Sequence, residues 1–122
     1  MIIVDTSIWI DQLYAPDAQF AELLYRQIVV IHPYVIGEIL LGSLRDRVAV
    51  RTQLLALDQA PVAEPREILN LIESTTLYGS GIGYVDAHLL ASALLLLGGR
   101  VLTRDRRLHA AAERLGIAFA AA

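Results

Sequence analysis

Residues 1–7 of the chain read Met-Ile-Ile-Val-Asp-Thr-Ser. Three consecutive apolar residues predict a short buried strand, and Asp5 follows directly where that strand ends. The hydroxyls of Thr6 and Ser7 suit the start of a helix. Because ligands of open α/β sheets bind outside the carboxyl ends of the strands, we expect Asp5 at a binding edge. The alternative is that Asp5 only caps the helix that follows it.

Strand-like and helical patterns alternate along the rest of the chain. Helices are predicted over residues 7–14, 17–27, 33–44, 47–59, 65–77, 85–97 and 105–115. Further strands are predicted over residues 28–31, 60–63, 100–103 and 117–119, although Pro61 weakens the second of these. This alternation predicts an α/β fold, a three-layer sandwich in which helices cover both faces of a mostly parallel sheet. With no repeat or linker, residues 1–122 are expected to form one domain.

The composition is more apolar than that of an average soluble domain, with 56% hydrophobic residues and a mean hydropathy of +0.53. We interpret the surplus as a partner interface. A membrane span is disfavoured because the longest uncharged stretch, residues 87–99, is too short. The N-terminus has no basic segment before Asp5, so neither a signal nor a transit peptide is supported and a cytoplasmic protein is expected.

The charged residues narrow the possible chemistry. The formal net charge is −3, which argues against a broad basic surface for nucleic acid. All ten basic residues are arginine, so lysine chemistry such as a Schiff base or a Walker loop is excluded. The chain also lacks cysteine, which excludes disulfides, thiolate metal sites and cysteine nucleophiles.

Three further acids extend the pattern begun by Asp5. Glu38 lies in an otherwise apolar helical stretch, Asp86 opens a predicted helix, and Asp105 follows a predicted strand. Each has a structural explanation of its own, as a solvent-facing side chain or a helix cap. A parallel sheet, however, brings all four to one edge, where carboxylates repel each other unless a cation shares the site. Oxygen ligands suit Mg²⁺ or Mn²⁺, and such metals activate water for attack on phosphorus.

Four stretches carry a family resemblance: Val-Asp-Thr-Ser at 4–7, Gly-Glu-Ile-Leu-Leu-Gly at 37–42, Val-Asp-Ala-His-Leu-Leu-Ala-Ser-Ala-Leu at 85–94 and Leu-Thr-Arg-Asp-Arg-Arg-Leu at 102–108. Together they resemble the PIN domain, and within it the VapC-type toxins of prokaryotic toxin–antitoxin pairs. The resemblance implies a five-stranded parallel sheet and a Mg²⁺- or Mn²⁺-dependent endoribonuclease. It also implies a homodimer and inhibition by a VapB-type antitoxin.

The resemblance assigns roles to individual positions. Asp5, Glu38, Asp86 and Asp105 become the catalytic, metal-binding acids, and we call them the acidic quartet. Thr6 and Thr103 become supporting hydroxyls. One departure is Leu108, which stands where an aromatic residue is usual after the last acid and affects local packing more than catalysis.

The remaining polar residues are less specific. Arg104, Arg106 and Arg107 flank Asp105 and are candidates for holding RNA phosphates, although at least two of them are expected only to balance nearby acids. Nothing in the sequence pairs the three histidines, so we interpret them as structural: His32, His88 and His109. Residues 79–83 lack the third glycine of a dinucleotide fingerprint and are interpreted as a hinge or loop.

Two alternatives come from other functional classes. A phospho-acceptor receiver domain has a similar length and an acidic pocket at the strand ends, but it relies on a lysine that this chain lacks. A non-catalytic module of PIN fold, binding RNA or protein, is disfavoured because all four acids are present. Turnover of RNA with Mg²⁺, as opposed to binding alone, separates the second alternative from an enzyme.

Overall fold

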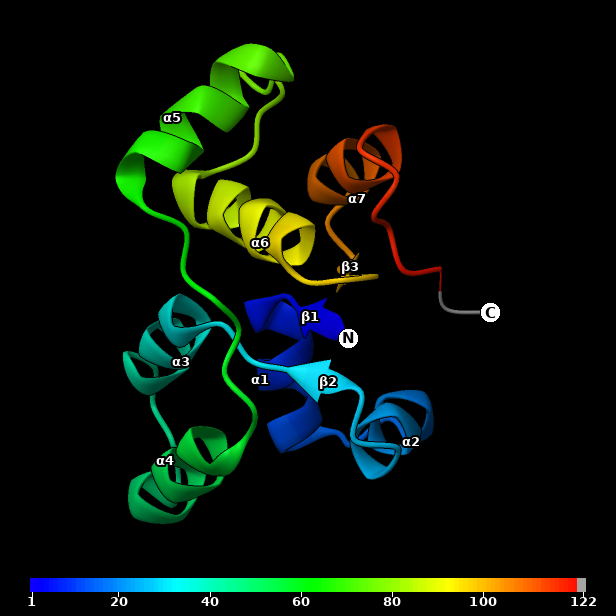
Figure 1. The fold of residues 1–122 in the computed structure, drawn as a ribbon. Coiled ribbons are helices and arrows are strands. Elements are labelled where there is room, and N and C mark those ends of the chain that lie inside the picture. Colours follow the sequence, from blue (N-terminus) through cyan, green and yellow to red (C-terminus); the bar gives the residue numbers. More distant parts are fainter. Residues whose placement is uncertain (121–122) are drawn as a thin grey trace.

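The structure, a computed structural model, describes residues 1–120. Three short strands lie at its centre, with helices around them (Figure 1). The strands are β1 (Ile2–Val4), β2 (Val29–Val30) and β3 (Arg100–Leu102). The helices are α1 (Thr6–Tyr14), α2 (Ala18–Tyr25), α3 (Pro33–Leu40), α4 (Arg47–Ala56), α5 (Pro65–Ser74), α6 (Tyr84–Leu95) and α7 (Arg106–Arg114).

The sheet has the order β2-β1-β3, and both strand pairs are parallel. β1 is the central strand, and its three residues are fully buried, which explains why the opening stretch is continuously apolar. Helix α6 packs against β1 and β3, and α7 packs against β3. The predicted α/β class with a parallel sheet is confirmed. All three strands run the same way, so their carboxyl ends meet at one edge.

The prediction of five strands is wrong for the described residues, which form three. Next to the segment expected as a strand over 60–63, Ile31 forms a single bridge with Gln59, and the N–H of Ala60 donates to the carbonyl of Ile31. Pro61 follows at once and has no N–H to extend the pairing. The segment expected over 117–119 likewise makes a single bridge, with Val101 exchanging backbone hydrogen bonds with Ile117 and Phe119.

Three helices end three or four residues earlier than predicted. Helix α3 stops at Leu40 because the Arg47 guanidinium donates to the carbonyls of Leu40 and Gly42, at 2.6 and 3.0 Å, and so caps the helix from outside. Helix α4 stops at Ala56, after which the backbone turns to pair with Ile31. Helix α5 stops at Ser74, and the chain reverses through Thr76 at a positive φ of 55°.

The hydrophobic core surrounds the sheet and includes all three β1 residues and much of α6. Helix α6 is buried from Ala87 to Ala93 without interruption, so it has no wide polar face. In the part of the chain that the structure describes, no helix is long and apolar enough to cross a membrane.

Candidate active site

Asp5 follows β1 directly and is held against the end of β3. Its backbone N–H donates to the carbonyl of Leu102 at the end of β3, at 3.0 Å. Its carboxylate Oδ2 accepts a 2.6 Å hydrogen bond from the Thr103 hydroxyl. The side chain does not cap α1, although Asp5 occupies the N-cap position. The alternative that Asp5 serves only as a helix cap therefore has no hydrogen bond to support it.

Thr103 is a buried hydroxyl that connects two acids of the quartet. It donates to Asp5, and its Oγ1 accepts a 3.0 Å hydrogen bond from the backbone N–H of Asp105. One hydroxyl thus acts as both donor and acceptor, and it links the residue after β1 to the start of the segment that leads into α7. These two hydrogen bonds are the contacts through which Thr103 would support the site, and its supporting role stays a prediction.

Glu38 reaches the same region from α3. Its Oε1 accepts a 2.6 Å hydrogen bond from the hydroxyl of Thr6, the first residue of α1. Helices α1 and α3 pack against each other, which brings this pair together. Glu38 is exposed, as the solvent-facing explanation predicts. Its hydrogen bond with Thr6 nevertheless holds the carboxylate next to the residue that follows Asp5.

Asp105 caps helix α7. Its Oδ1 accepts from the backbone N–H groups of Arg107 and Leu108, at 2.9 and 3.0 Å. The capping explanation is therefore correct for Asp105, and it leaves the second carboxylate oxygen outside the cap. A helix cap and a site ligand are compatible roles when each uses a different oxygen.

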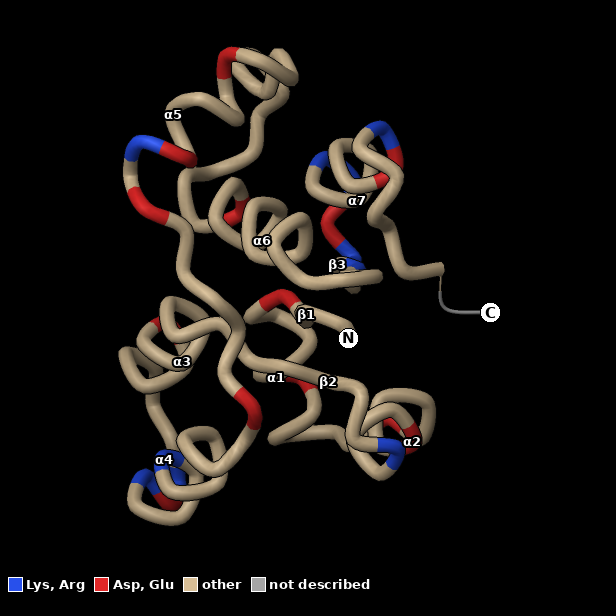
Figure 2. Tube along the Cα trace, viewed as in Figure 1, with Lys and Arg blue, Asp and Glu red and all other residues tan. Residues whose placement is uncertain are grey.

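Asp86 lies in the first turn of α6 and is partly buried. Its Oδ2 accepts a 3.3 Å hydrogen bond from the N–H of Gly83, at the start of α6. Burial raises the pKa of this carboxyl above its usual value, the Gly83 hydrogen bond opposes the rise, and the other three acids raise it further. The positions of the four acids lie after β1, in α3, in α6 and between β3 and α7 (Figure 2). The structure thus brings the other three acids of the quartet close enough to Asp86 to change its pKa.

The quartet offers hard oxygen donors, which suit Mg²⁺ or Mn²⁺. None of the four takes part in an ion pair within residues 1–120, so their mutual repulsion is not relieved by an arginine or histidine. In the same part of the chain, no three acidic or histidine side chains are close enough to form a ready-made metal site. A cation would therefore draw the carboxylates together from the positions in which Thr6, Thr103 and the α7 backbone hold them.

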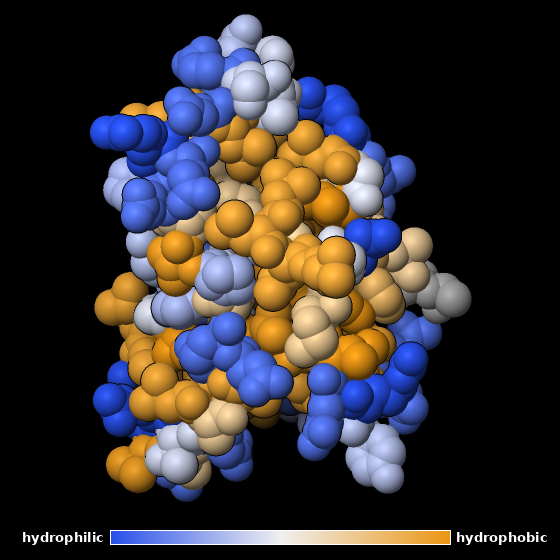
Figure 3. All heavy atoms as spheres, in the orientation of Figure 1, coloured by the Kyte–Doolittle hydropathy of each residue, from blue (hydrophilic) through white to orange (hydrophobic). Residues whose placement is uncertain are grey.

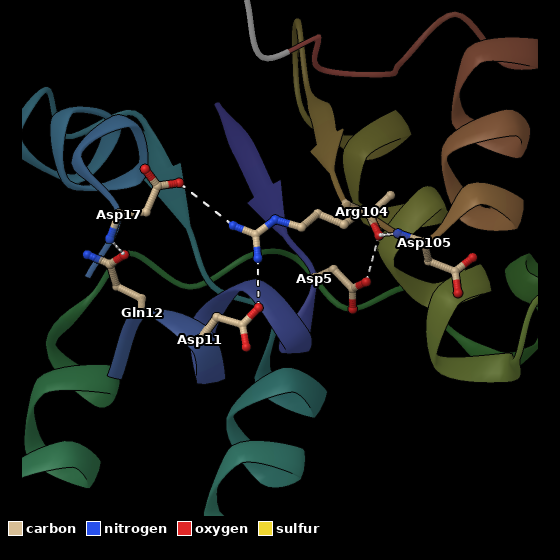
Figure 4. A network of polar contacts seen from close by, with 7 residues as sticks. Asp5, Asp11, Gln12, Asp17, Arg104 and Asp105 are labelled. Carbon is tan, nitrogen blue, oxygen red and sulfur yellow. Dashed lines mark hydrogen bonds and ion pairs between the residues drawn. The ribbon is translucent and has the colours of Figure 1, made fainter. Parts of the chain in front are cut away.

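Arg104 is directed away from the quartet. Its guanidinium lies 2.7 Å from Asp11 and 3.7 Å from Asp17, and Figure 4 shows it between these two acids. Arg104 therefore balances nearby acids, one of the two outcomes expected from the sequence. Its side chain also ties the β3–α7 connection to α1 and to the N-cap of α2.

Arg107 lies over the glycine segment. A Cβ atom at Gly81 would come within 2.8 Å of the Arg107 guanidinium, and Gly81 has a positive φ of 84°, so both the space and the backbone favour glycine. This contact brings Arg107 next to the segment that leads into Asp86. Arg106 is exposed and lines a hollow of about 420 Å³ together with Arg104 and His109. The RNA-binding role of the arginines stays a prediction.

Sequence reasoning did not single out a cluster of aromatic rings beside Glu38 and Asp86. His32 and His88 are almost completely buried, consistent with a structural role, and their rings contact each other at 5.9 Å between centroids. Tyr34 and Tyr84 join them. The only signal in the sequence is that each tyrosine lies a few residues before an acid of the quartet.

Comparison with known proteins identifies the family. The PIN domain family matches residues 2–114. The chain belongs to the PIN-domain family. Two relatives, each called Ribonuclease VapC32, come from Mycobacterium tuberculosis strains CDC 1551 / Oshkosh and ATCC 25618 / H37Rv. Each is 47% identical over 120 residues, covering 98% of this chain and 97% of the relative. The resemblance to VapC-type PIN domains is thereby confirmed.

Solved structures support the fold of this PIN domain. The structure of FitAB bound to an IR36 DNA fragment matches with a TM-score of 0.65 at 20% identity, over 93% of this chain and 91% of the matched chain. The crystal structure of PAE2754 from Pyrobaculum aerophilum matches with a TM-score of 0.63 at 19% identity, over 97% and 87%. At these identities the likeness shows the fold alone.

Proposed function

We propose that this PIN domain is the toxin of a type II toxin–antitoxin pair and acts as a Mg²⁺- or Mn²⁺-dependent endoribonuclease. The observation that carries the proposal is a quartet of acids at the carboxyl edge of the sheet that forms no ion pair within residues 1–120 and in which one member, Asp86, has a raised pKa. Such mutual repulsion costs stability unless an external cation is bound. The ribonuclease designation of the two 47% identical relatives adds the substrate class.

Each acid has a distinct task in this proposal. Asp5, Asp86 and Asp105 would hold the metal, because they lie at the ends of β1 and β3 and at the first turn of α6. Glu38, exposed and oriented by Thr6, would complete the site or orient the attacking water. Thr103 keeps Asp5 and the start of α7 in register. When bound, the metal supplies activation of water and stabilisation of charge on the phosphoryl oxygens.

The same acids make the site a target for inhibition. We infer that a VapB-type antitoxin places an arginine or lysine against the quartet and so competes with the metal. The free carboxylates repel each other, which favours any cation that enters. Purified antitoxin should stop RNA cleavage, and alanine in place of its inserted cation should weaken the inhibition. If the antitoxin binds while cleavage is unchanged, this mode of control is wrong.

Exposed apolar side chains favour a homodimer. Near the C-terminal end of α6, Leu94 and Leu95 are about half exposed and Leu97 is fully exposed, and Figure 3 shows apolar atoms gathered across the middle of this face. Leu41 and Val48, at the α3 and α4 helices, are also exposed. Burying such surface between two copies stabilises a dimer. Light scattering at micromolar concentration should give the dimer mass, and a monomer mass would contradict this part of the proposal.

The decisive experiment is cleavage of single-stranded RNA by the purified chain with Mg²⁺ or Mn²⁺, with excess EDTA as the control. Cleavage is expected with metal and not with EDTA. Persistence of cleavage in EDTA would overturn the metal dependence. RNA binding without turnover would instead favour the non-catalytic alternative.

A further inference from the structure

Two half-exposed tyrosines flank the acidic quartet on the side of α3 and α6. Tyr34 lies one helical turn before Glu38 on α3, and Tyr84 is the first residue of α6, two positions before Asp86. Tyr34 is 41% exposed and Tyr84 is 51% exposed. Both helices begin at the sheet edge where the acids gather, because α3 follows β2 directly and α6 runs from this edge back to β3. The tyrosines therefore border the site.

Both tyrosine rings contact the same buried imidazole, that of His88. The His88 ring centroid is 4.6 Å from that of Tyr34 and 4.9 Å from that of Tyr84, and both contacts are edge-to-face. His32 lies behind them, 4.9 Å from Tyr34. Histidine burial is nearly complete, with 0% exposure for His32 and 2% for His88. The four rings are connected by edge-to-face contacts, and the two tyrosines among them are partly exposed to solvent.

The His32 imidazole is held in the uncharged form. His32 Nδ1 accepts a 3.0 Å hydrogen bond from the N–H of Tyr34, so a neutral ring carries its proton on Nε2. Burial lowers the pKa of His32 to about 4, with a further contribution from His88. The ring next to Tyr34 is thus neutral and aromatic, and surroundings of this kind suit an uncharged planar ligand better than a phosphate.

The two sides of the quartet differ in chemistry. On the β3–α7 side, Arg106 and Arg107 are exposed cations suited to phosphate, whereas the α3–α6 side presents aromatic rings. A single-stranded RNA has both kinds of group, charged phosphates and flat bases that stack on aromatic side chains. An acidic quartet alone repels RNA, so a base-binding contact next to it would contribute affinity that charge does not.

We propose that Tyr34 and Tyr84, supported by His88 and His32, form a stacking subsite for an unpaired base of the RNA next to the phosphate held at the acidic quartet. This inference rests on the proposed ribonuclease function. The subsite contributes affinity and places the strand, and it takes no part in the bond-breaking step. Because every base has a flat face, the subsite tolerates different sequences.

The test measures stacking directly. A short single-stranded oligoribonucleotide containing 2-aminopurine is titrated with the cleavage-deficient Asp5→Asn protein in Mg²⁺, and the fluorescence of 2-aminopurine is followed. Quenching is expected on binding. Leucine at Tyr34 or Tyr84 keeps apolar bulk but removes the ring, so each substitution should weaken binding by about 5- to 20-fold and reduce the quenching. Phenylalanine keeps the ring and should restore both.

Tyr25→Leu is the matched control, because Tyr25 is an exposed tyrosine on α2 with no ring contact within residues 1–120. In otherwise wild-type protein, the Tyr34→Leu and Tyr84→Leu variants should raise KM for RNA more than they lower kcat. Wild-type cleavage with unchanged binding and quenching in both leucine variants would overturn the subsite. If the leucine variants weaken only antitoxin binding, the surface docks protein and the inference is wrong. A protein that neither cleaves nor binds RNA with its tyrosines intact would refute the proposed function itself.

Discussion

The molecule has two groups of acidic side chains that differ in their charge partners. Asp11 and Asp17 share the guanidinium of Arg104, at 2.7 and 3.7 Å. The acidic quartet has no ion pair within residues 1–120, and burial together with the other three acids raises the pKa of Asp86. The negative charge of the first group is partly balanced by the protein itself. The second has no such partner within residues 1–120, and in the proposed function a metal ion supplies the missing positive charge.

The largest effect should distinguish one acid of each group. Asp5→Asn removes a proposed metal ligand while keeping an acceptor for Thr103, so RNA cleavage should fall by more than about 100-fold with little change in Tm. Asp11→Asn is the matched variant and should lower only the stability, by less than about 1 kcal/mol. Initial cleavage rates and thermal unfolding of both proteins check this. Equal activity losses in the two variants would remove the distinction between the groups.

A somewhat smaller effect is expected at the hydroxyl that orders the quartet. Thr103→Val is nearly isosteric but removes both the bond to Asp5 and the acceptor for the Asp105 N–H. Loss of such supporting contacts costs about 10- to 100-fold in metal affinity or activity. Titration of Mg²⁺ in cleavage assays should show a raised metal requirement. Thr103→Ser, which keeps the hydroxyl, should recover most of the lost activity.

The positions of the four acids were accessible from the sequence, because Asp5 and Asp105 follow apolar stretches and parallel strands end together. The partners of Arg104 were not, since Asp11 and Asp17 are far from it in the chain and their meeting depends on tertiary packing. The same holds for the contact between His32 and His88. The strands predicted over 60–63 and 117–119 are absent for a local reason. Their composition is typical of strands, but composition does not supply the repeated backbone hydrogen bonds that a strand needs.

An intermediate effect concerns stability and metal together. Because the folded-state pKa of Asp86 is raised, the folded protein holds this proton more strongly than the unfolded chain. The contribution of Asp86 to stability is therefore present at low pH and is lost as the pH rises through its folded-state pKa. Asp86→Asn should raise the free energy of unfolding at neutral pH by at most about 1 kcal/mol, because solvent screens part of the repulsion, and this should appear as a Tm increase of a few degrees.

The same variant tests whether the repulsion serves metal binding. Added Mg²⁺ should raise the Tm of the wild-type protein, because a ligand that binds only the folded state stabilises it. For Asp86→Asn this rise should be much smaller, and cleavage should be lost. Thermal scans with and without Mg²⁺ at two pH values measure both. A lower Tm for Asp86→Asn at neutral pH, or an undiminished Mg²⁺ response, would contradict this account.

The smallest effect should separate Arg104, in the β3–α7 connection, from Arg107, on α7. Arg104 is committed to two half-exposed acids, so Arg104→Ala should lower stability by about 0.2–1 kcal/mol and the loss should shrink at high salt. Arg107 has no acidic partner within residues 1–120 and lies over Gly81, so Arg107→Ala should act mainly by raising KM for RNA. Unfolding and steady-state cleavage at low and high salt compare the two variants. If Arg104→Ala raises KM as much as Arg107→Ala, then Arg104 exchanges its acids for phosphate when RNA binds, and the two acidic groups are parts of one RNA-binding surface.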